Sequence, residues 1–317
     1  MLLRRVGAHC NAPLRSILCA FGRSMLRPYN SLLMQSTIPA ATSDSSARRR
    51  KPRRGGWFRI GEEIPRGLYT FIALMSFVLP LILWCVLSYG KFITPLILPT
   101  PDAVLKGAWR LKESGALWDD TWISVTRIGI GFLLSAVLAI PLGILIGAYK
   151  GVEAAQEPLV SFIRYIPVPA LTPLIMVIAG VDESAKILLI FIGTYFQMVI
   201  VVADVTRQVP RDLLSASRTL GASRWQQLLY VLLPATLPGL MDTCRTMLGW
   251  AWTYLVIAEV IAANSGLGYR IMQGQRFLRT DQIFVGIFVL GFLGLLTDLV
   301  FKWLQPRMLP WAEVARS

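Results

Sequence analysis

Charged side chains inside or at the ends of long apolar segments include Arg164, Asp242, Arg245 and Glu259. A charge in such a segment is costly and is by default a candidate for function. Asp242 and Arg245 are three residues apart, so in a helix they would share one face and could pair. For each arginine two readings stay open: contact with an anion that passes through the protein, or a structural or gating tie between helices.

The neighbours of these charges add detail. Arg164 precedes IPVPALTP, whose three prolines would interrupt a helix and open backbone groups toward a pathway. Glu259 lies near the flexible Gly266 and Gly268, so it could form a gate or a dock for an external protein. Trp250 is expected to pack against neighbours or to line a cavity. The two arginines make a small anion a plausible ligand.

The sequence holds no pattern that would carry covalent chemistry. It has no GxxxxGK[ST] phosphate-binding loop, no HExxH and no GxSxG. Its only histidine, His9, lies near the N-terminus, and its four cysteines lack the spacing of metal ligands. We therefore expect a protein that is not an enzyme and that itself binds no metal or cofactor.

A segment of small and basic residues, SASRTLGASRWQQLLYVLLP (215–234), separates two apolar segments. Asp212, just before it, suits the first turn of a helix. Gly221 can take the left-handed backbone that ends a helix, and Ser223 with Gln226 matches the capping box that starts another. The sequence predicts a short helix, a sharp glycine turn and a second helix that runs into the membrane. Such a smooth helix, held on the end of a span, would suit docking by another protein.

The composition is that of a polytopic membrane protein. Of the 317 residues, 55% are hydrophobic and 16% are charged, and the mean hydropathy is +0.57. Residues 67–90 and 128–148 contain no charge, and each run exceeds the roughly 18 residues of a membrane-span candidate. We predict an all-α fold with six membrane-spanning helices at about 67–90, 126–148, 158–181, 187–206, 231–258 and 282–304.

The net charge of +14 is explained by membrane orientation rather than by a nucleic-acid partner. Of the 32 Lys and Arg, 13 precede Gly67, which places both termini in the cytoplasm if there are six spans. Residues 98–115 are predicted to form a helix on the outer surface, with Thr100 as its N-cap. Gly143 and Gly147 are four residues apart, a spacing that lets two helices pack closely.

Residues 1–66 are predicted to be a basic, disordered cytoplasmic tail. Its run ARRRKPRRGG (47–56) could be attracted to anionic membrane lipid. Two other readings stay open: an organelle transit peptide, or an over-extended reading frame whose true start is Met34. The membrane domain is predicted to cover 67–312, with 313–317 as a C-terminal tail.

The segment 215–234 resembles the EAA loop of ATP-binding-cassette (ABC) importer permeases. Ser215 stands where that loop usually has Glu, and Ser217 where it usually has Ala, so any ion pair of that glutamate is lost here. ILPTPDAVLKGAW, RYIPVPALTPLIMV and WAWTYLVIAEVIAANSGLGYRI are similar to the nitrate, sulfonate, taurine and bicarbonate branch of these permeases, and the resemblance covers about 65–312. The positions of the loop's pattern are occupied in this sequence by Ser215, Ala216, Ser217, Gly221, Val231, Leu233 and Pro234.

The resemblance implies a type I importer permease in the bacterial cytoplasmic (inner) membrane. It would pair with a second copy of itself and import a small anion delivered by a periplasmic or lipid-anchored binding protein. ATP and Mg would be held by separate cytoplasmic ATPase subunits, whose closure would swing the spans through the coupling loop 207–230. The residues implied in coupling are Asp212, Ser215, Ala216, Ser217, Gly221, Ala222, Ser223, Arg224, Leu233 and Pro234.

Other functions stay open at this point. A gradient-driven secondary transporter is disfavoured because the chain shows no clear inverted repeat, which many such transporters have. An ABC permease of another branch, such as one for methionine or glycine betaine, would differ mainly in its solute. A membrane enzyme or scaffold is disfavoured by the lack of catalytic groups.

Overall fold

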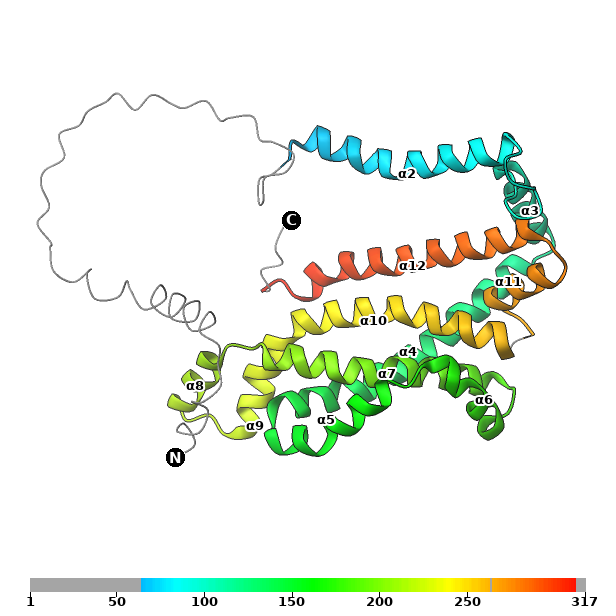
Figure 1. Cartoon of the computed structure of the whole chain (residues 1–317). Coiled ribbons are helices and arrows are strands. Elements are labelled where there is room, and N and C mark those ends of the chain that lie inside the picture. The colour runs from blue at the N-terminus through cyan, green and yellow to red at the C-terminus, as the bar shows by residue number, and fades with distance from the viewer. Residues whose placement is uncertain (1–63, 263, 312–317) are drawn as a thin grey trace, which may run out of the picture. The chain divides into compact units, whose positions relative to one another are not determined.

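The computed structural model describes residues 64–262 and 264–311, and every regular element in them is helical (Figure 1). The chain divides into two compact units, Met1–Thr70 and Phe71–Ser317. Most of the predicted tail 1–66, the alternative start at Met34 and the C-terminal tail 313–317 lie outside the described residues.

The described helices, in chain order, are α2 (Arg66–Tyr89), α3 (Pro101–Glu113), α4 (Ala116–Ala148), α5 (Lys150–Arg164), α6 (Val168–Ala179), α7 (Glu183–Arg207), α8 (Arg211–Thr219), α9 (Arg224–Gln226), the π-helix η1 (Gln227–Leu232), α10 (Leu233–Ala262), α11 (Leu267–Arg276) and α12 (Thr280–Met308).

Four of the described helices are long and apolar enough to cross a membrane: α2, α4, α7 and α12. The pair α5 and α6 passes the same test together, although the two helices are bent by 96° at their junction. α10 has 30 residues, but Asp242, Arg245 and Glu259 lower its hydropathy and it does not pass. The predicted all-α polytopic fold is confirmed. The count is four or five spans by length and composition, and the predicted six requires α10 as well.

Proline divides the predicted span 158–181 into two helices. α5 ends at Arg164, and α6 begins at Val168, directly after Pro167. A proline disfavours helical backbone in the residue before it and has no N–H to continue the helix. The prolines therefore do more than distort one span, since the chain turns by 96° between the two helices.

Glycines let α4 and α7 approach each other closely. A Cβ added at Gly143 would lie 2.7 Å from the carbonyl oxygen of Val199, and one at Gly147 would lie 2.7 Å from that of Ala203. Neither position has room for a side chain, which confirms the close packing predicted from the glycine spacing. A buried apolar cluster surrounds this contact, with Ala139, Ile146, Met198, Val202 and Leu240 among its members.

α8 and α9 lie at one end of the helices, and α3 and α11 lie at the other (Figure 1); we call these the α8 end and the α11 end. The helix predicted within 98–115 is present as α3, whose N-cap Thr100 accepts from the Ala103 N–H at 3.4 Å. Hydrogen bonds from the hydroxyls of Thr100 and Tyr89 lower the pKa of Asp102 to about 2. α3 is thereby fixed at its start to the end of α2.

Candidate functional site

The predicted helix–turn–helix is present at the α8 end. α8 starts after Pro210 and carries Asp212 in its first turn. Gly221 then adopts a left-handed backbone with a φ of +81°, as the sequence predicted. The N–H of Ala222 donates to the carbonyl oxygen of Ser217 at 3.0 Å, which closes the end of the helix.

Ser223 starts the second helix through the predicted capping box. Its hydroxyl accepts from the Gln226 N–H at 3.4 Å, and its own N–H donates to the side-chain oxygen of Gln226 at 2.8 Å. Gln227 then joins the two helices: its amide nitrogen donates to the Ala222 carbonyl at 2.9 Å, and its amide oxygen accepts from Arg218 Nε at 3.3 Å. These bonds hold α8 and α9 as one rigid unit.

The π-helix η1 links α9 to α10 without a break. The Leu233 N–H donates to the carbonyl oxygen of Leu228, five residues earlier, as in a π turn. Pro234 has no N–H, and in an α-helix its ring would clash with the carbonyl four residues before it. The wider π turn directly before Pro234 gives the ring room. A displacement of α9 would therefore pass along a continuous helix into α10.

Exposed side chains cover the outer face of the α8–α9 unit. Leu220 is 88% exposed and Trp225 is 69% exposed. Ser217, by contrast, is buried, and its hydroxyl donates to the Leu214 carbonyl at 2.8 Å. Ala222, Leu233 and Pro234 are half-buried. The predicted coupling residues that are exposed are Asp212, Ser215, Ala216, Gly221, Ser223 and Arg224.

A buried charge network holds the α11 end together around Arg127 of α4, which is 2% exposed. Its guanidinium donates to both carboxylate oxygens of Glu183 at 2.6 and 2.7 Å, and to Glu259 at 2.7 Å. It also donates to the carbonyl oxygen and hydroxyl of Ser265 at 2.8 and 3.1 Å. Bidentate pairs of this kind are strong and directional. One arginine therefore joins α4, α7, α10 and the segment before α11.

Glu259 is 0% exposed, and both of its oxygens are hydrogen-bonded. Oε1 accepts from Ser124 and Arg127, each at 2.7 Å, and Oε2 accepts from the Gly268 N–H at 2.7 Å. A Cβ at Gly268 would lie 2.7 Å from the Cβ of Glu259. The sequence suggested a gate or a dock for this residue. Because the carboxylate has no exposed surface, it cannot dock a partner in this conformation, and it instead anchors the segment 264–268.

Side chains of α4 accept hydrogen bonds from the backbone N–H groups at the start of α11. Asp120 accepts from the Gly266 N–H at 2.8 Å and from Arg270 Nε at 2.7 Å. Ser124 accepts from the Leu267 N–H at 3.0 Å. With Glu259 on Gly268, three consecutive N–H groups at this helix start each have a side-chain acceptor, which removes the cost of leaving them unpaired.

Comparison with known proteins decides the family. Residues 139–310 match the family described as binding-protein-dependent transport system inner membrane component. A protein of Bacillus subtilis, SsuC, named as an aliphatic sulfonates transport permease, is 34% identical over 271 residues, 85% of this chain and 94% of that protein. The chain belongs to this family of permeases.

Two further similarities agree with this assignment. TauC, the taurine transport system permease protein of Escherichia coli, is 33% identical over 236 residues, 73% of this permease and 86% of that protein. A solved structure of the inward-facing MetNI methionine ABC transporter matches the fold with a TM-score of 0.52 at 23% identity, over 59% of this permease and 94% of that chain. The second match shows the fold alone. The resemblance to ABC importer permeases is confirmed over the alternative of a gradient-driven transporter.

Asp120, Ser124 and Arg127 were not among the predicted functional residues of the permease. Their spacings of four and three place them on one helix face, and that signal is present in DDTWISVTRIG. The span predicted at 126–148 excluded two of the three. In the structure α4 begins at Ala116, because the polar residues that precede the predicted span are also helical.

Arg245 lies between two carboxylates of the permease. Its Nη2 is 3.5 Å from Asp242 Oδ1, and its Nε is 3.7 Å from Asp298 Oδ1 on α12. Asp298 also pairs with Lys302 at 2.7 Å. The predicted pairing of Asp242 and Arg245 is thus present, within a group of two positive and two negative charges. This group joins α10 to α12, which favours the structural tie over direct contact with an anion.

Arg164 has a different environment. Its guanidinium lies 4.9 Å from the centre of the Tyr165 ring and donates to the Tyr165 hydroxyl at 3.1 Å. Among the described residues its buried Nε has no hydrogen-bond partner, and no carboxylate forms an ion pair with it. The side chain lines a small cavity with Gln197 and Tyr254. Trp250 lies exposed on α10. Of the two predicted arginines, Arg164 has the free donor that an anion contact needs.

Removing Arg245 is expected to slow transport without changing the KM for the solute. The Arg245→Ala variant loses the tie between α10 and α12, which plays no part in binding the solute. Asp298→Asn weakens the same tie and should give the same result in an uptake assay over a range of solute concentrations. If Arg245→Ala raised the KM while Asp298→Asn, which removes one of the two carboxylates beside the guanidinium, lowered it, Arg245 would be an anion ligand.

Proposed function

We propose that this permease imports a small sulfonate across the bacterial cytoplasmic membrane, as a homodimer driven by separate cytoplasmic ATPase subunits. The observation that carries the proposal is the rigid α8–α9 unit, which presents exposed side chains on one side and continues into α10 on the other. A unit that is both exposed and continuous with a core helix is suited to convert the motion of a partner into motion of the bundle.

The ATPase subunits would bind ATP and Mg and would dock on the outer face of this unit. Leu213, Leu220 and Trp225 supply apolar surface there, and exposed aromatic and aliphatic groups of this kind are typical anchors of protein interfaces. Closure of two ATPases on ATP would displace α8 and α9, and the continuous helix through η1 would carry that displacement into α10.

The solute class is drawn from the two relatives, which are named for aliphatic sulfonates and for taurine. Sulfonates are anions, and Arg164 offers a guanidinium that no carboxylate neutralises among the described residues. Arg245 and Glu259 act in this proposal as ties between helices rather than as solute contacts. The binding protein of the family would deliver the solute at the α11 end. There Arg110, Arg270 and Arg279 border a cavity of about 380 Å³.

The α8 end would face the cytoplasm. α2 ends beside α3 at the α11 end, and the sequence that precedes α2 is basic. Of the 32 Lys and Arg, 13 precede Gly67. The positive-inside rule favours the cytoplasm for this basic sequence, and a single crossing by α2 then favours the cytoplasm for the α8 end as well.

The proposal is tested by purifying the tagged full-length permease from its native membrane in mild detergent and identifying the proteins that accompany it. The expected partners are a second copy of the permease and a stoichiometric ATPase. The complex is then reconstituted into liposomes with its binding protein, and uptake of radiolabelled taurine, nitrate and bicarbonate is measured with and without ATP. Taurine uptake that requires ATP is the expected result.

Two outcomes contradict parts of the proposal. Uptake of nitrate or bicarbonate without taurine would show that the solute class is wrong and the importer is right. Absence of any ATPase after crosslinking, together with uptake driven by an ion gradient alone, would show that the coupling scheme itself is wrong.

A further inference from the structure

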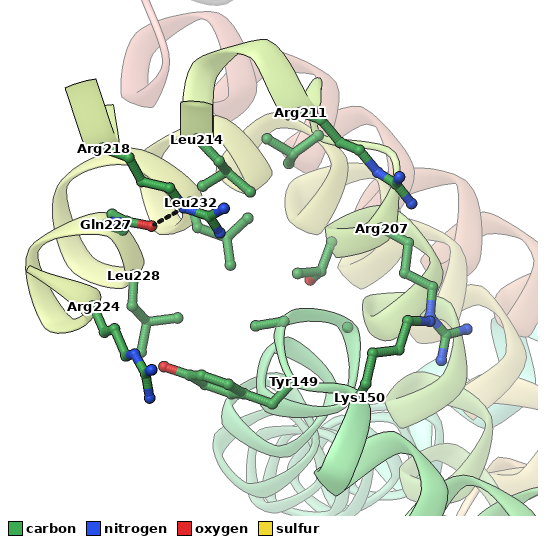
Figure 2. Close-up of a pocket in the computed structure, with 14 residues that line it drawn as sticks. Tyr149, Lys150, Arg207, Arg211, Leu214, Arg218, Arg224, Gln227, Leu228 and Leu232 are labelled. Atoms are coloured by element: carbon green, nitrogen blue, oxygen red, sulfur yellow. Dashed lines mark hydrogen bonds between the residues drawn. The ribbon is translucent and has the colours of Figure 1, made fainter. Parts of the chain in front are cut away.

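A basic cavity of about 480 Å³ lies at the α8 end, between the ends of α4 and α7 and the α8–α9 unit. Figure 2 shows its side chains arranged around one open space, with α8 on one side and the start of α5 on the other. The cavity is separate from the exposed outer face of α8 described above. Its basic lining residues are Lys150, Arg207, Arg211, Arg218 and Arg224, and none of its lining residues within 64–262 and 264–311 is a carboxylate.

Two of the five cations are neutralised and three are not. Lys150 pairs with Glu153 at 2.6 Å, and Arg207 pairs with Asp204 at 2.9 Å and with Glu157. The remaining three, Arg211, Arg218 and Arg224, form no ion pair with any residue in 64–262 or 264–311. Three unpaired like charges that border one cavity repel each other, and an anion between them would reduce that repulsion.

Two of these arginines lie at helix starts, where a positive charge is not favoured. A cation at the C-terminal end of a helix is favourable, which accounts for Arg207 in the last turn of α7. Arg211 and Arg224 are instead the first residues of α8 and α9, where the helix dipole disfavours a cation. Stabilising these helix starts therefore does not explain these two arginines, whereas a bound anion does.

We do not expect the partner ATPase to supply that anion, because the cavity and the proposed docking face lie on opposite sides of α8. Arg211, Leu214 and Arg218 line the cavity, and the two arginines are exposed to it. Leu213, Ala216 and Leu220 are also exposed but do not line the cavity. The second set is displaced from the first by two residues along the helix, which is about 200° around its axis. A protein seated on the exposed face would not reach into the cavity.

Apolar side chains line the cavity between the arginines. They are Val209, Leu214, Leu228 and Leu232, of which Val209 and Leu232 are buried. We propose that this cavity binds a phosphate group at the arginines, and that the head group of an anionic phospholipid of the inner leaflet is its source. A phospholipid would suit both kinds of lining residue, since its phosphate can pair with guanidinium groups and its glycerol and upper acyl chain can contact the leucines and Val209.

Binding at this position would brace the α8–α9 unit. Arg211 and Arg218 lie on α8, Arg224 begins α9, and Lys150 begins α5, so one phosphate would connect the moving unit to a neighbouring helix. The proposal does not depend on which solute the permease carries, and its test is separate from the uptake assay.

The test uses the full-length permease, purified and stripped of lipid, with phosphatidylglycerol, phosphatidylcholine and inorganic phosphate as probes. Native mass spectrometry measures the dissociation constant of each lipid, and inorganic phosphate is added as a competitor. The variant Arg211→Gln/Arg218→Gln/Arg224→Gln is compared with Lys106→Gln/Arg276→Gln/Arg279→Gln, which removes the same charge from exposed positions at the α11 end. The expected result is that phosphatidylglycerol binds more tightly than phosphatidylcholine, and that the first variant alone weakens it by at least about tenfold.

Other outcomes decide the source or overturn the proposal. Binding of inorganic phosphate that the first variant alone loses, without any preference between the two lipids, would keep the phosphate site and assign it to soluble phosphate. Equal weakening in both variants, or in neither, would overturn the site. Loss of ATPase binding in the first variant with lipid binding unchanged would assign the arginines to the protein interface and overturn it as well. The single variant Arg211→Gln, with the smaller loss expected of one charge, replaces the triple variant if the latter does not fold.

Discussion

The Gly221→Val variant is expected to lose ATP-driven transport while remaining inserted and folded. Gly221 has a φ of +81°, and a Cβ built there meets no atom within 4 Å, so the cost is strain of the backbone and not a clash. A β-branched residue is a genuine outlier in that region, at a cost of about 1–3 kcal/mol. The strain falls on the one residue that sets the direction of α8 relative to α9. Uptake and ATPase activity of the reconstituted complex, together with the unfolding temperature, would measure the effect.

Gly221→Asn is the matched control, because asparagine tolerates the left-handed conformation better than other non-glycine residues. It adds bulk at the same exposed position but relaxes the backbone strain. We expect this variant to retain most of the transport rate. If asparagine abolished transport as fully as valine, the surface at Gly221 and not the turn conformation would be the critical feature. If valine had no effect, the turn would play no part in coupling.

The α8–α9 unit could be predicted because its signals are local. The glycine, the capping box of Ser223 with Gln226 and the proline at 234 lie within a few residues of the bonds they form. The apolar runs likewise predict α2, α7 and α12 to within about four residues at each end, because burial in lipid imposes hydropathy on each helix separately. What these signals could not give was the direction of the chain after α5, where prolines indicate a break but not an angle of 96°.

The charge network at the α11 end could not be predicted in full because it is not local. Arg127 meets Glu183 and Glu259, which lie 56 and 132 residues further along the chain. Helix spacing alone joins Asp120, Ser124 and Arg127, but no sequence pattern says which carboxylates face them. From the sequence alone, a buried Glu259 that anchors a segment cannot be distinguished from an exposed Glu259 that acts as a gate. Only the packing of α4, α7 and α10 distinguishes the two roles.

Arg127→Ala is expected to destabilise the permease strongly. It removes the cation from Glu259, which is 0% exposed, and leaves a buried carboxylate without its ion-pair partner. Breaking a buried pair in this way costs about 3–5 kcal/mol, which corresponds to a fall of about 10 °C in the unfolding temperature of a domain of this size. Thermal unfolding of the purified permease in detergent, followed by tryptophan fluorescence, measures the change.

The double variant Arg127→Met/Glu259→Gln distinguishes the loss of the ion pair from the cost of leaving one buried charge unpaired. Because it removes both charges, it should be less destabilised than Arg127→Ala. The glutamine oxygen can accept from the Gly268 N–H, and the amide nitrogen can donate to the Ser124 hydroxyl oxygen, whose bond to Glu259 is reversed. Arg276→Ala, at an exposed position on α11, should leave the unfolding temperature unchanged. An Arg127→Ala variant as stable as the wild type would mean that Glu259 is neutral in the folded permease. The segment 264–268 would then be held by hydrogen bonds rather than by the ion pair.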